Sequence, residues 1–576
     1  MRASILSKLL GGAIAAAPLM SCPAAAQVFP SQAAMTPEPA DLILTNGRIY
    51  RNEEGWADAV AIAKGVIIDV GDVAKVMTHR TSATKVTDLG GKAVLPGLHD
   101  MHLHAVNAGT PMCKMTRDDS PDKIRAIVRA CVAKAKPGEW VVGRGWVNAV
   151  FKDEPQDRKL LDEVAPNNPV VLTDVTGHSI WVNSAALKLA KIDRATPNPT
   201  NGVIERRPDG EANGLLREGG RGMIYPLVPQ PTGEQKIEYL ERALTEMLSF
   251  GITAVQEAGN NDSLETWAQL YDLGRLHTRG KLCLRNLYNI NGIDPGFERH
   301  YARRSEYRRE LISPDCIKIP GDGVPGDGQT AAMIDPYPNP LSEDRKFGIL
   351  FTPPEVLKKW VTRFDADGMS VLMHCTGDRC TRTFLDAIEV ARKTNGNGGP
   401  RHQVGHSNFI KVEDIARARN LGASFEFSAY LYYRDPATEV YLKAIGPERF
   451  ERYKPVREAI DAGVNVVEGA DWPVSASVDP WLAIETLVTR LPPGETKGER
   501  LAPREAITLK EAIDIYTING AKQFGHGDRV GRIRPGYYAD LIVLDRNPFE
   551  IPITQVHDVN VLTTMLKGQI VYEAKR

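Results

Sequence analysis

The segment Val94-Leu95-Pro96-Gly97-Leu98-His99-Asp100-Met101-His102-Leu103-His104 decides how the rest of the chain is interpreted. It places three histidines within six residues, directly after an apolar run and a Pro-Gly turn, in a chain with 12 histidines among 576 residues. Side chains at positions i and i+2 of a strand point to the same face. We therefore expect His102 and His104 to project together, with Asp100 on their side. His99 faces the other way, where we expect it to pack or to be hydrogen-bonded.

The composition is that of a globular protein, with 42% hydrophobic and 25% charged residues. The length corresponds to one large domain or to about two to four ordinary ones. The formal net charge is −1, so nothing in the charge balance indicates nucleic acid or an anionic membrane as a partner. After the first 26 residues, no run of about 18 consecutive apolar residues occurs, so no transmembrane span is predicted.

The first residues have the pattern of a secretory signal. Arg2 and Lys8 precede a short apolar core, and Ala24-Ala25-Ala26 matches a cleavage site. We expect residues 1–26 to be removed and the product to be periplasmic or secreted, with lipoprotein anchoring at Cys22 as the alternative. An oxidising compartment permits disulfides, but the spacing of the other six cysteines assigns no pairing.

Both ends of the chain are rich in short strand-like runs. Two of these runs flank Asn46-Gly47, and an Asn-Gly pair in this setting is a strong hairpin signal. The pattern recurs around Lys64-Gly65 and around Lys567-Gly568. We predict that residues 40–93 and 526–576 pair into one composite β-sandwich domain, with the middle of the chain inserted between them.

The middle of the chain alternates helix-like segments with short apolar runs. The helical segments are Asp122–Lys136, Gly233–Phe250, Pro354–Asp367, Val412–Leu421 and Leu509–Tyr516. The apolar runs include Val170–Leu172, Thr253–Val255, Ile317–Ile319, Ser370–Met373 and Val464–Val467. This alternation indicates parallel βα units. We predict a (β/α)8 TIM-like barrel over residues 94–525, with an insertion at about 141–220. The alternative, an open doubly wound sheet, would place a glycine-rich phosphate loop after its first strand, and that loop is missing from the sequence.

Four histidines and an aspartate stand at the ends of separate predicted strands. His102 and His104 end the first run, His374 and His406 end two later runs, and Asp471 follows another. Active sites of (β/α)8 barrels lie at the C-terminal ends of the strands, so these side chains should meet at one mouth. Imidazole and carboxylate are ligands of Zn²⁺ and similar ions. The sequence therefore predicts a divalent metal site, with Zn²⁺ as the default ion.

The order of these residues resembles that of the amidohydrolase superfamily, metal-dependent hydrolases on a (β/α)8 barrel with a β-sandwich made from both chain ends. The chain is most similar to the amidohydrolase 3 branch, which includes N-substituted formamide deformylase. The matching motifs extend over almost the whole chain after the signal. They include Val141–Trp146, Thr176–Leu187, Gly377-Asp378-Arg379, Asp471-Trp472-Pro473 and Arg534–Leu541.

The resemblance implies a particular set of ligands for one or two metal ions per chain. It implies that the more buried ion is held by His102, His104 and Asp471. A second ion would be held by His374 and His406.

The resemblance also implies that Lys318, carboxylated in many members of the superfamily, bridges the two ions. An unmodified ammonium has three donors and no acceptor, so this ligation requires the modification. Two alternatives remain open. Lys318 can be an ordinary charge paired with Asp322, or Cys316, on the same face of the strand, can be a soft ligand in its place.

The activity implied by the resemblance is hydrolysis of an amide-type C–N bond other than a peptide bond. Metal-activated water would attack the carbonyl, and Asp471 would act as general base. His178, in a Thr-Gly-His-Ser segment, is predicted to donate to the oxyanion, or else it ties down its loop. Trp146 and Glu218 are predicted, with His178, to contact the substrate.

Two other functions are compatible with the pattern. One is a deaminase, or a hydrolase of a cyclic amide or imide, on the same scaffold, which a mononuclear site would favour. The other is a non-catalytic metal-containing binding or sensory protein, which would have no need of a general base at Asp471. The expected partner is a small-molecule substrate, and a homodimer is the default assembly.

Overall fold

The computed structural model describes residues 37–575, apart from 111, 117–118, 152–155, 200–201, 260, 287, 290–291, 294, 327 and 429–431. Two units are distinguished, residues 1–38 and residues 39–576, and the helices and strands belong to the second. The predicted signal segment, residues 1–26, lies outside the described residues. Among the described helices, none combines the length and apolar character that crossing a membrane requires.

An eight-stranded parallel sheet forms the centre of the second unit. Its strands, in spatial order, are β8 (Leu98–Leu103), β15 (Ile252–Glu257), β16 (Arg279–Arg285), β19 (Ile312–Pro320), β20 (Ser370–Cys375), β21 (Gln403–His406), β22 (Ser424–Glu426) and β23 (Asn465–Val467). The first and last strands approach each other, because Met101 N donates to Glu468 O and His104 N donates to Trp472 O, both at 2.8 Å. The sheet is thus a nearly closed barrel, and the open doubly wound alternative is wrong.

The predicted helices form within about four residues of the predicted ends. They are α3 (Pro121–Val132), α6 (Gly233–Ser249), α9 (Pro354–Ala366), α11 (Val412–Asn420) and α16 (Leu509–Asp514). In α6, Thr232 and Gln235 form a capping box that satisfies free backbone N–H groups at the helix start. Leu240, Leu244 and Met247 recur at helical spacing and are buried, which gives the helix one apolar face for packing.

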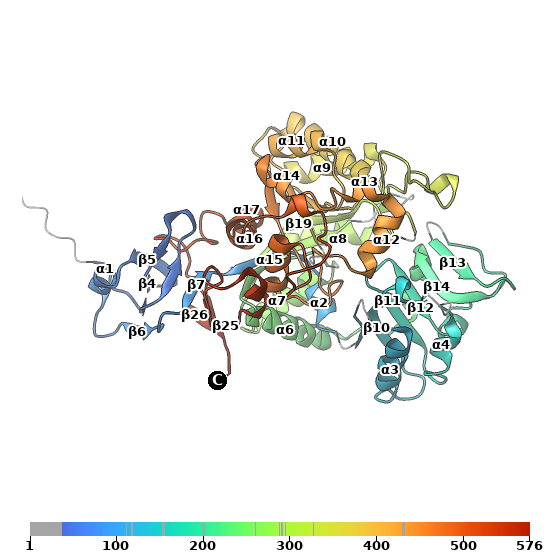
Figure 1. Cartoon of the computed structure of the whole chain (residues 1–576), viewed down its shortest axis with the longest axis horizontal. Coiled ribbons are helices and arrows are strands. Elements are labelled where there is room, and N and C mark those ends of the chain that lie inside the picture. The colour runs from blue at the N-terminus through green and yellow to red at the C-terminus, as the bar shows by residue number, and fades with distance from the viewer. Residues whose placement is uncertain are drawn as a thin grey trace, which may run out of the picture. The chain divides into compact units, whose positions relative to one another are not determined.

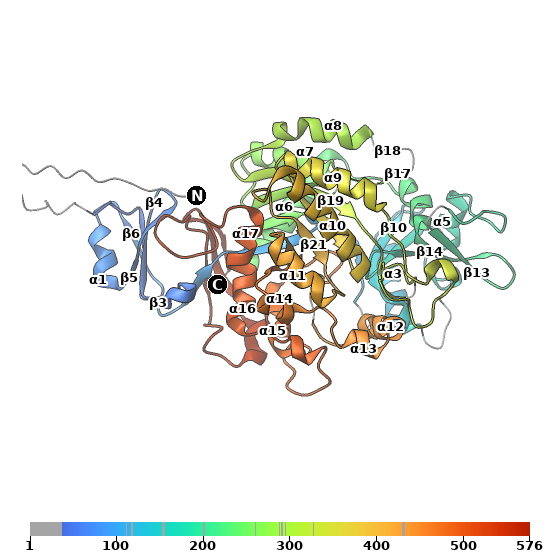
Figure 2. The ribbon, with the colours of Figure 1, turned by 90° about the horizontal axis from the view of Figure 1, so that it is seen from above.

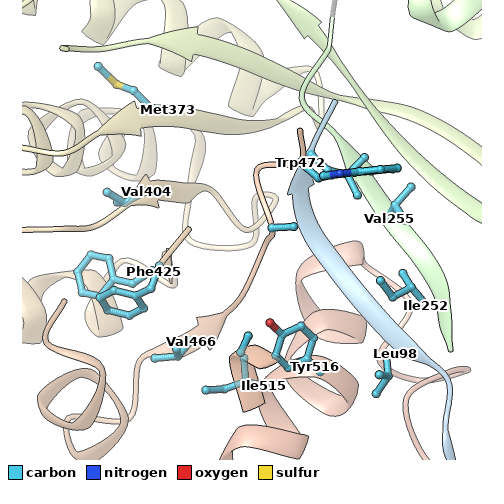
Figure 3. Close-up of a cluster of buried hydrophobic side chains, with 14 of the residues drawn as sticks. Leu98, Ile252, Val255, Met373, Val404, Phe425, Val466, Trp472, Ile515 and Tyr516 are labelled. Carbon is cyan, nitrogen blue, oxygen red and sulfur yellow. The ribbon is translucent and has the colours of Figure 1, made fainter. Parts of the chain in front are cut away.

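One large hydrophobic core is shared by barrel strands and surrounding helices (Figure 3). Leu98 and Ile252 come from the first two strands, Phe425 and Val466 from the last two, and Tyr516 from the segment after α16. Because these side chains are fully buried and come from distant parts of the sequence, they hold the two edges of the barrel together.

A six-stranded sheet is inserted between β8 and β15. Its order is β13 (Gly202–Arg206), β14 (Ala212–Glu218), β12 (Ser179–Val182), β11 (Val170–Asp174), β10 (Val141–Trp146) and β9 (Cys113–Lys114). Figure 1 shows these strands in teal, beside α3 and α4 (Arg158–Asp162). Val170–Leu172 lies within the range predicted as an insertion, at about 141–220, whereas the assignment of the helix after Asp122 to the barrel is wrong. Strands β10 and β11 form a parallel pair, so their apolar pattern is the same as that of two neighbouring barrel strands.

Strands from both chain ends share a second six-stranded sheet, ordered β26 (Gln569–Glu573), β25 (Val561–Leu566), β24 (Leu541–Leu544), β7 (Ala93–Pro96), β2 (Arg48–Tyr50) and β3 (Trp56–Ala57). A four-stranded sheet follows the order β5 (Val66–Gly71), β4 (Ala59–Ala63), β1 (Leu42–Thr45) and β6 (Lys85–Asp88). Figures 1 and 2 show these blue N-terminal strands beside the red C-terminal segment. Leu44 and Val60 of one sheet share a hydrophobic cluster with Val94 and Val543 of the other.

The turns that join these strands are only partly as predicted. Lys64-Gly65 and Lys567-Gly568 do join hairpins, and all four residues have positive φ, as a type I′ turn requires. The hairpin predicted at Asn46-Gly47 is wrong, because β1 pairs within the four-stranded sheet and β2 within the six-stranded one. The chain crosses between the sheets there, and a side chain at Gly47 would come within 2.7 Å of Leu89 Cδ1.

The six cysteines outside the predicted signal form three disulfides: Cys113–Cys131, Cys283–Cys316 and Cys375–Cys380. The first joins β9 to α3 in the inserted region. The second joins the neighbouring barrel strands β16 and β19, and the third joins β20 to α10 (Asp378–Asn395).

Candidate metal centre

All the predicted metal ligands lie at the C-terminal end of the barrel. They lie at or within a few residues of the ends of β8, β19, β20, β21 and β23: His102 and His104, Lys318, His374, His406 and Asp471. The fold thus brings these side chains together from segments far apart in sequence.

The first group of candidate ligands is His102, His104 and Asp471. Each offers one ligand atom, and these atoms lie within 4.8 Å of one another. Asp471 Oδ1 is 3.3 Å from His104 Nε2 and 3.7 Å from His102 Nε2. Burial lowers the pKa of His104 to about 4, so its imidazole is neutral, the form that binds a metal. Burial acts to raise the pKa of Asp471, whereas the neighbouring imidazoles together act to lower it. The resulting pKa lies below the ordinary value of an aspartate.

A second group is formed by His374 and His406. Their ring centroids are 4.1 Å apart, and His406 is 4.8 Å from the ring of His102. Burial, with the surrounding charged and imidazole groups, holds the pKa of both histidines well below the ordinary value. His406 has a positive φ of 68° and Asp471 one of 51°. Non-glycine residues rarely adopt this backbone, and such strain is commonly stored at functional sites.

Lys318 lies inside the first group, with Nζ 2.8 Å from His102 Nε2. Burial lowers its pKa to about 8. The predicted alternative of a pair with Asp322 is wrong, because that carboxylate accepts backbone N–H bonds from residues 332, 376 and 377. The alternative of Cys316 as a soft ligand is also wrong, because its sulfur is bonded to Cys283.

Glu426, at the end of β22, holds His102 in place and was missed in the sequence. Its Oε2 lies 2.7 Å from His102 Nδ1 and accepts from His406 N at 3.2 Å, while Oε1 accepts from Ser428 N at 2.6 Å. A carboxylate on Nδ1–H fixes the tautomer that leaves Nε2 free for a metal. No apolar run marks β22, which has three residues. The only signal is the alternation of Phe425 and Phe427 with polar neighbours.

Asp100 and His99 occupy opposite sides of β8, as the strand parity predicts. The Asp100 carboxylate accepts from His102 N and from Ala470 N, both at 3.0 Å, and so ties β8 to the loop that carries Asp471. Gly469 permits this close approach, because a Cβ there would lie 2.5 Å from His102 Cβ. His99 is buried and packs against Phe524, which confirms its predicted packing role.

We expect Glu426→Gln to weaken metal binding by about 10–100-fold, because loss of a partner that orients a metal-binding histidine has effects of this size. Affinity for Zn²⁺ would be measured by competition with a chromogenic chelator. Glu485→Gln is the matched control, since buried Glu485 makes an analogous 2.7 Å contact with His557 Nδ1 away from the metal centre. Equal affinities of the two variants would contradict the assigned role of Glu426.

His178 and Glu218 form an ion pair beside the second group. His178 Nδ1 is 3.1 Å from Glu218 Oε2, and its ring centroid is 5.5 Å from that of His374. Burial acts to raise the pKa of Glu218, but the charge and hydrogen bond of His178, together with Arg221 and Thr330, lower it to about 2. Burial likewise opposes a charged His178, but the Glu218 carboxylate raises its pKa above the ordinary value. The arrangement thus favours an imidazolium at His178, next to the candidate ligand His374.

Two small cavities adjoin these groups. One, of about 70 Å³, is lined by His374, His406 and Asp471, with an apolar wall made by Val175, Val324, Ala437, Tyr441 and Val474. The other, of about 60 Å³, is lined by His178, Glu218 and Trp146 among others. Trp146 is fully buried and its indole N–H donates to Leu172 O at 3.0 Å, so it contributes only part of the wall.

A nearly closed parallel barrel whose mouth gathers four imidazoles, a carboxylate and a buried lysine is the architecture of a metal-dependent hydrolase. The model of the amidohydrolase family matches residues 85–572, and the chain belongs to this family. It is accordingly a hydrolase that acts on carbon–nitrogen bonds.

Individual relatives agree with this membership. The chain is 28% identical over 549 residues to N-substituted formamide deformylase of Arthrobacter pascens, covering 92% of this chain and 98% of the relative. It is 28% identical over 537 residues to the putative amidohydrolase YtcJ of Bacillus subtilis (strain 168), covering 90% and 97%. The fold is similar to that of an uncharacterized metal-dependent hydrolase from Pyrococcus horikoshii, with a TM-score of 0.70 and 22% identity, covering 89% and 99%.

Proposed function

We propose that the protein hydrolyses a non-peptide secondary amide that has a small acyl group and an apolar substituent on nitrogen. The observation that carries the proposal is the convergence of His102, His104 and Asp471 next to a cavity with an apolar wall. The similarity to an enzyme named as a deformylase of N-substituted formamides supports the same class of substrate.

The donor set fits a divalent metal. Two imidazoles and a carboxylate within 4.8 Å form the ligand set that Zn²⁺ prefers, so His102, His104 and Asp471 would hold one ion. His374 and His406 would hold a second. When bound, such an ion lowers the pKa of a coordinated water towards about 7 and polarises the substrate carbonyl.

Asp471 is the proposed general base. Its lowered pKa keeps it a carboxylate, and an ionised carboxylate accepts hydrogen bonds without donating them. It would take a proton from the attacking water and then deliver it to the nitrogen of the departing amine. The backbone of Asp471 is fixed for this role by hydrogen bonds from its N to His102 O at 2.6 Å and from Val474 N to its own carbonyl at 2.6 Å.

His178 is the proposed oxyanion donor. Glu218 engages Nδ1 and favours the charged imidazole, which leaves Nε2–H to donate to the carbonyl oxygen as negative charge develops there. Thr330 Oγ1 donates to Glu218 Oε1 at 2.9 Å and restrains the carboxylate. The apolar wall that includes Val175 and Tyr441 would take the nitrogen substituent and exclude water.

Carboxylation of Lys318 is part of the proposal. As an ammonium, Lys318 donates to His102 Nε2 at 2.8 Å and so occupies the lone pair that a metal needs. Addition of its amine to carbon dioxide, with loss of one proton, forms a carbamate and replaces this donor by two anionic oxygens. The carbamate of Lys318 would then supply oxygen ligands for the ions held by the two groups.

The first experiment combines a count of metal per chain with a substrate panel. Formamides and acetamides with apolar nitrogen substituents should release amine and carboxylate in equal amounts. Treatment with a chelator should abolish the activity, and Zn²⁺ should restore it. No hydrolysis of any amide at full metal occupancy would contradict the proposal and favour a binding protein. Release of free ammonia from ring substrates alone would favour a deaminase.

Two further proposals concern the ends of the chain. We propose that the terminal sheets constitute a composite β-sandwich domain over residues 40–93 and 526–576, supported by the hydrophobic cluster that they share. We also propose that residues 1–26 direct export. Mass spectrometry of protein recovered from the periplasm should then find Gln27 as the first residue, and an intact Met1 would contradict export.

A further inference from the structure

A third cavity, here called the basic pocket, lies at the end of the barrel opposite the metal centre. Its volume is about 370 Å³, within the usual range for sites of small ligands. It is lined by residues at the starts of four strands and by Lys522–His526 at the end of α17 (Gly520–Phe524). The strands of a parallel barrel all begin at one end and finish at the other, so strand starts and strand ends lie at opposite ends of the barrel. In agreement, the basic pocket and the cavity at the metal centre share no lining residue.

The lining of the basic pocket is rich in cations. They are Arg279, Lys281, Arg308, Arg309, Arg401 and Lys522, whereas the acids among the described lining residues are Glu310 and Asp315. Three of the cations are neutralised by partners, at Arg279–Asp540, Arg308–Asp315 and Arg309–Asp272. Glu310 in turn is paired with Lys567. The lining therefore keeps an excess of positive charge.

Three cations of the basic pocket account for this excess. Lys281 Nζ donates to Gln523 O at 3.0 Å, and Arg401 Nη1 donates to Gly422 O at 3.1 Å. Within the part of the chain that the structure describes, neither they nor Lys522 form an ion pair within 4.0 Å. Lys281 is only 6% exposed. The acid that acts on it electrostatically, Asp315, is already paired with Arg308. A buried charge without a counter-charge of its own is costly, so the cluster is incomplete as a purely structural feature.

The electrostatics of the basic pocket agree with a missing counter-charge. Burial lowers the pKa of Lys281 to about 8. Burial, together with Arg532 and Arg401, lowers the pKa of Lys522 despite the opposing charges of Glu53 and Asp514. Burial, with Arg279 and Lys281, lowers that of His526. A bound anion would oppose each of these shifts.

We propose that the basic pocket binds a small polyanion, bearing phosphate or at least two carboxylates, through Lys281, Arg401 and Lys522. The guanidinium of Arg401 offers a planar pair of donors that matches carboxylate or phosphate oxygens. The two lysines supply compact charges, and His526 supplies a further donor. This inference does not depend on the reaction catalysed at the other end of the barrel.

The test is thermal unfolding of the metal-loaded protein titrated with inorganic phosphate and, separately, with citrate, each against chloride at matched ionic strength. A ligand that binds only the native state raises the Tm in a saturable way. We expect such a rise with at least one of the two anions. In an Arg401→Gln/Lys522→Gln double variant, the half-saturating concentration should increase by at least about tenfold. Lys522 is exposed and Arg401 half-buried, so this variant should fold, as circular dichroism would verify.

The control variant is Lys188→Gln, which removes an exposed lysine from α5 (Ser184–Leu189), outside the pocket. It should respond to anions like the wild type. A response to phosphate alone would identify a phosphate-bearing ligand, and a response to citrate alone a polycarboxylate. The proposal is overturned if neither anion gives a saturable response. It is equally overturned if the double variant keeps the wild-type half-saturation, because the anion would then be binding elsewhere, such as at the metal centre.

Discussion

Asp471→Asn should reduce kcat by about 10³-fold while leaving most of the metal in place. The asparagine keeps the shape of the side chain and one oxygen near His104, so metal affinity should fall only modestly. It cannot accept the proton of the attacking water, and loss of general acid–base catalysis costs about 10²–10⁴-fold. KM should change little, because the carboxylate acts in the transition state rather than in substrate binding.

The measurements for this variant are steady-state kinetics and elemental analysis on the same preparation. Asp100→Asn is the comparison, because Asp100 bonds the backbone of residues 102 and 470 and contacts no candidate ligand atom. Asp100→Asn should retain kcat within about tenfold of the wild-type value, because Asp100 affects catalysis only by positioning its neighbours. Near-wild-type kcat for Asp471→Asn would show that another group is the base. A loss of kcat in proportion to lost metal would show that Asp471 serves only as a ligand.

Lys318→Ala should lower the metal content from about two ions per chain to about one and reduce kcat/KM by at least about 10²-fold. The reason is that the carbamate is proposed to be the only ligand shared by the two groups. The variant leaves a cavity next to His102, in which a short carboxylate could replace the missing oxygens. Formate or acetate should therefore restore part of the activity and the second ion, and methylamine should not.

Lys281→Ala is the matched control for Lys318→Ala. It removes another buried lysine from the neighbouring strand β16, at the far end of the barrel, so the metal content should not change. If methylamine rather than acetate rescued Lys318→Ala, the lysine would act as an ammonium and the bridged centre would be wrong. An unchanged metal count in Lys318→Ala would lead to the same conclusion.

Much of the barrel was predictable because its strands are local features. Ser370–Met373 and Gln403–Gly405 are short strand-like segments that each lead into a histidine, and the parity of a strand places His102 and His104 on one face. The rule that barrel sites lie at the C-terminal strand ends then groups these residues without any knowledge of contacts. β16 and β22 escaped this reasoning, because Arg279–Arg285 has only three consecutive apolar residues between charged ones, and Ser424–Glu426 is too short to form a run.

The barrel, the candidate ligands and the family could be predicted from the sequence, because each depends on patterns within a few residues or on their order. Which residues touch one another follows from the tertiary structure, because the partners lie far apart along the chain. Glu426 reaches His102 across 324 positions, and Lys318 contacts His102 rather than Asp322. The basic pocket likewise combines charges from strand starts and from α17 that are ordinary one by one. Such contacts are set by barrel closure and by the burial of the shared core, and no local pattern encodes them.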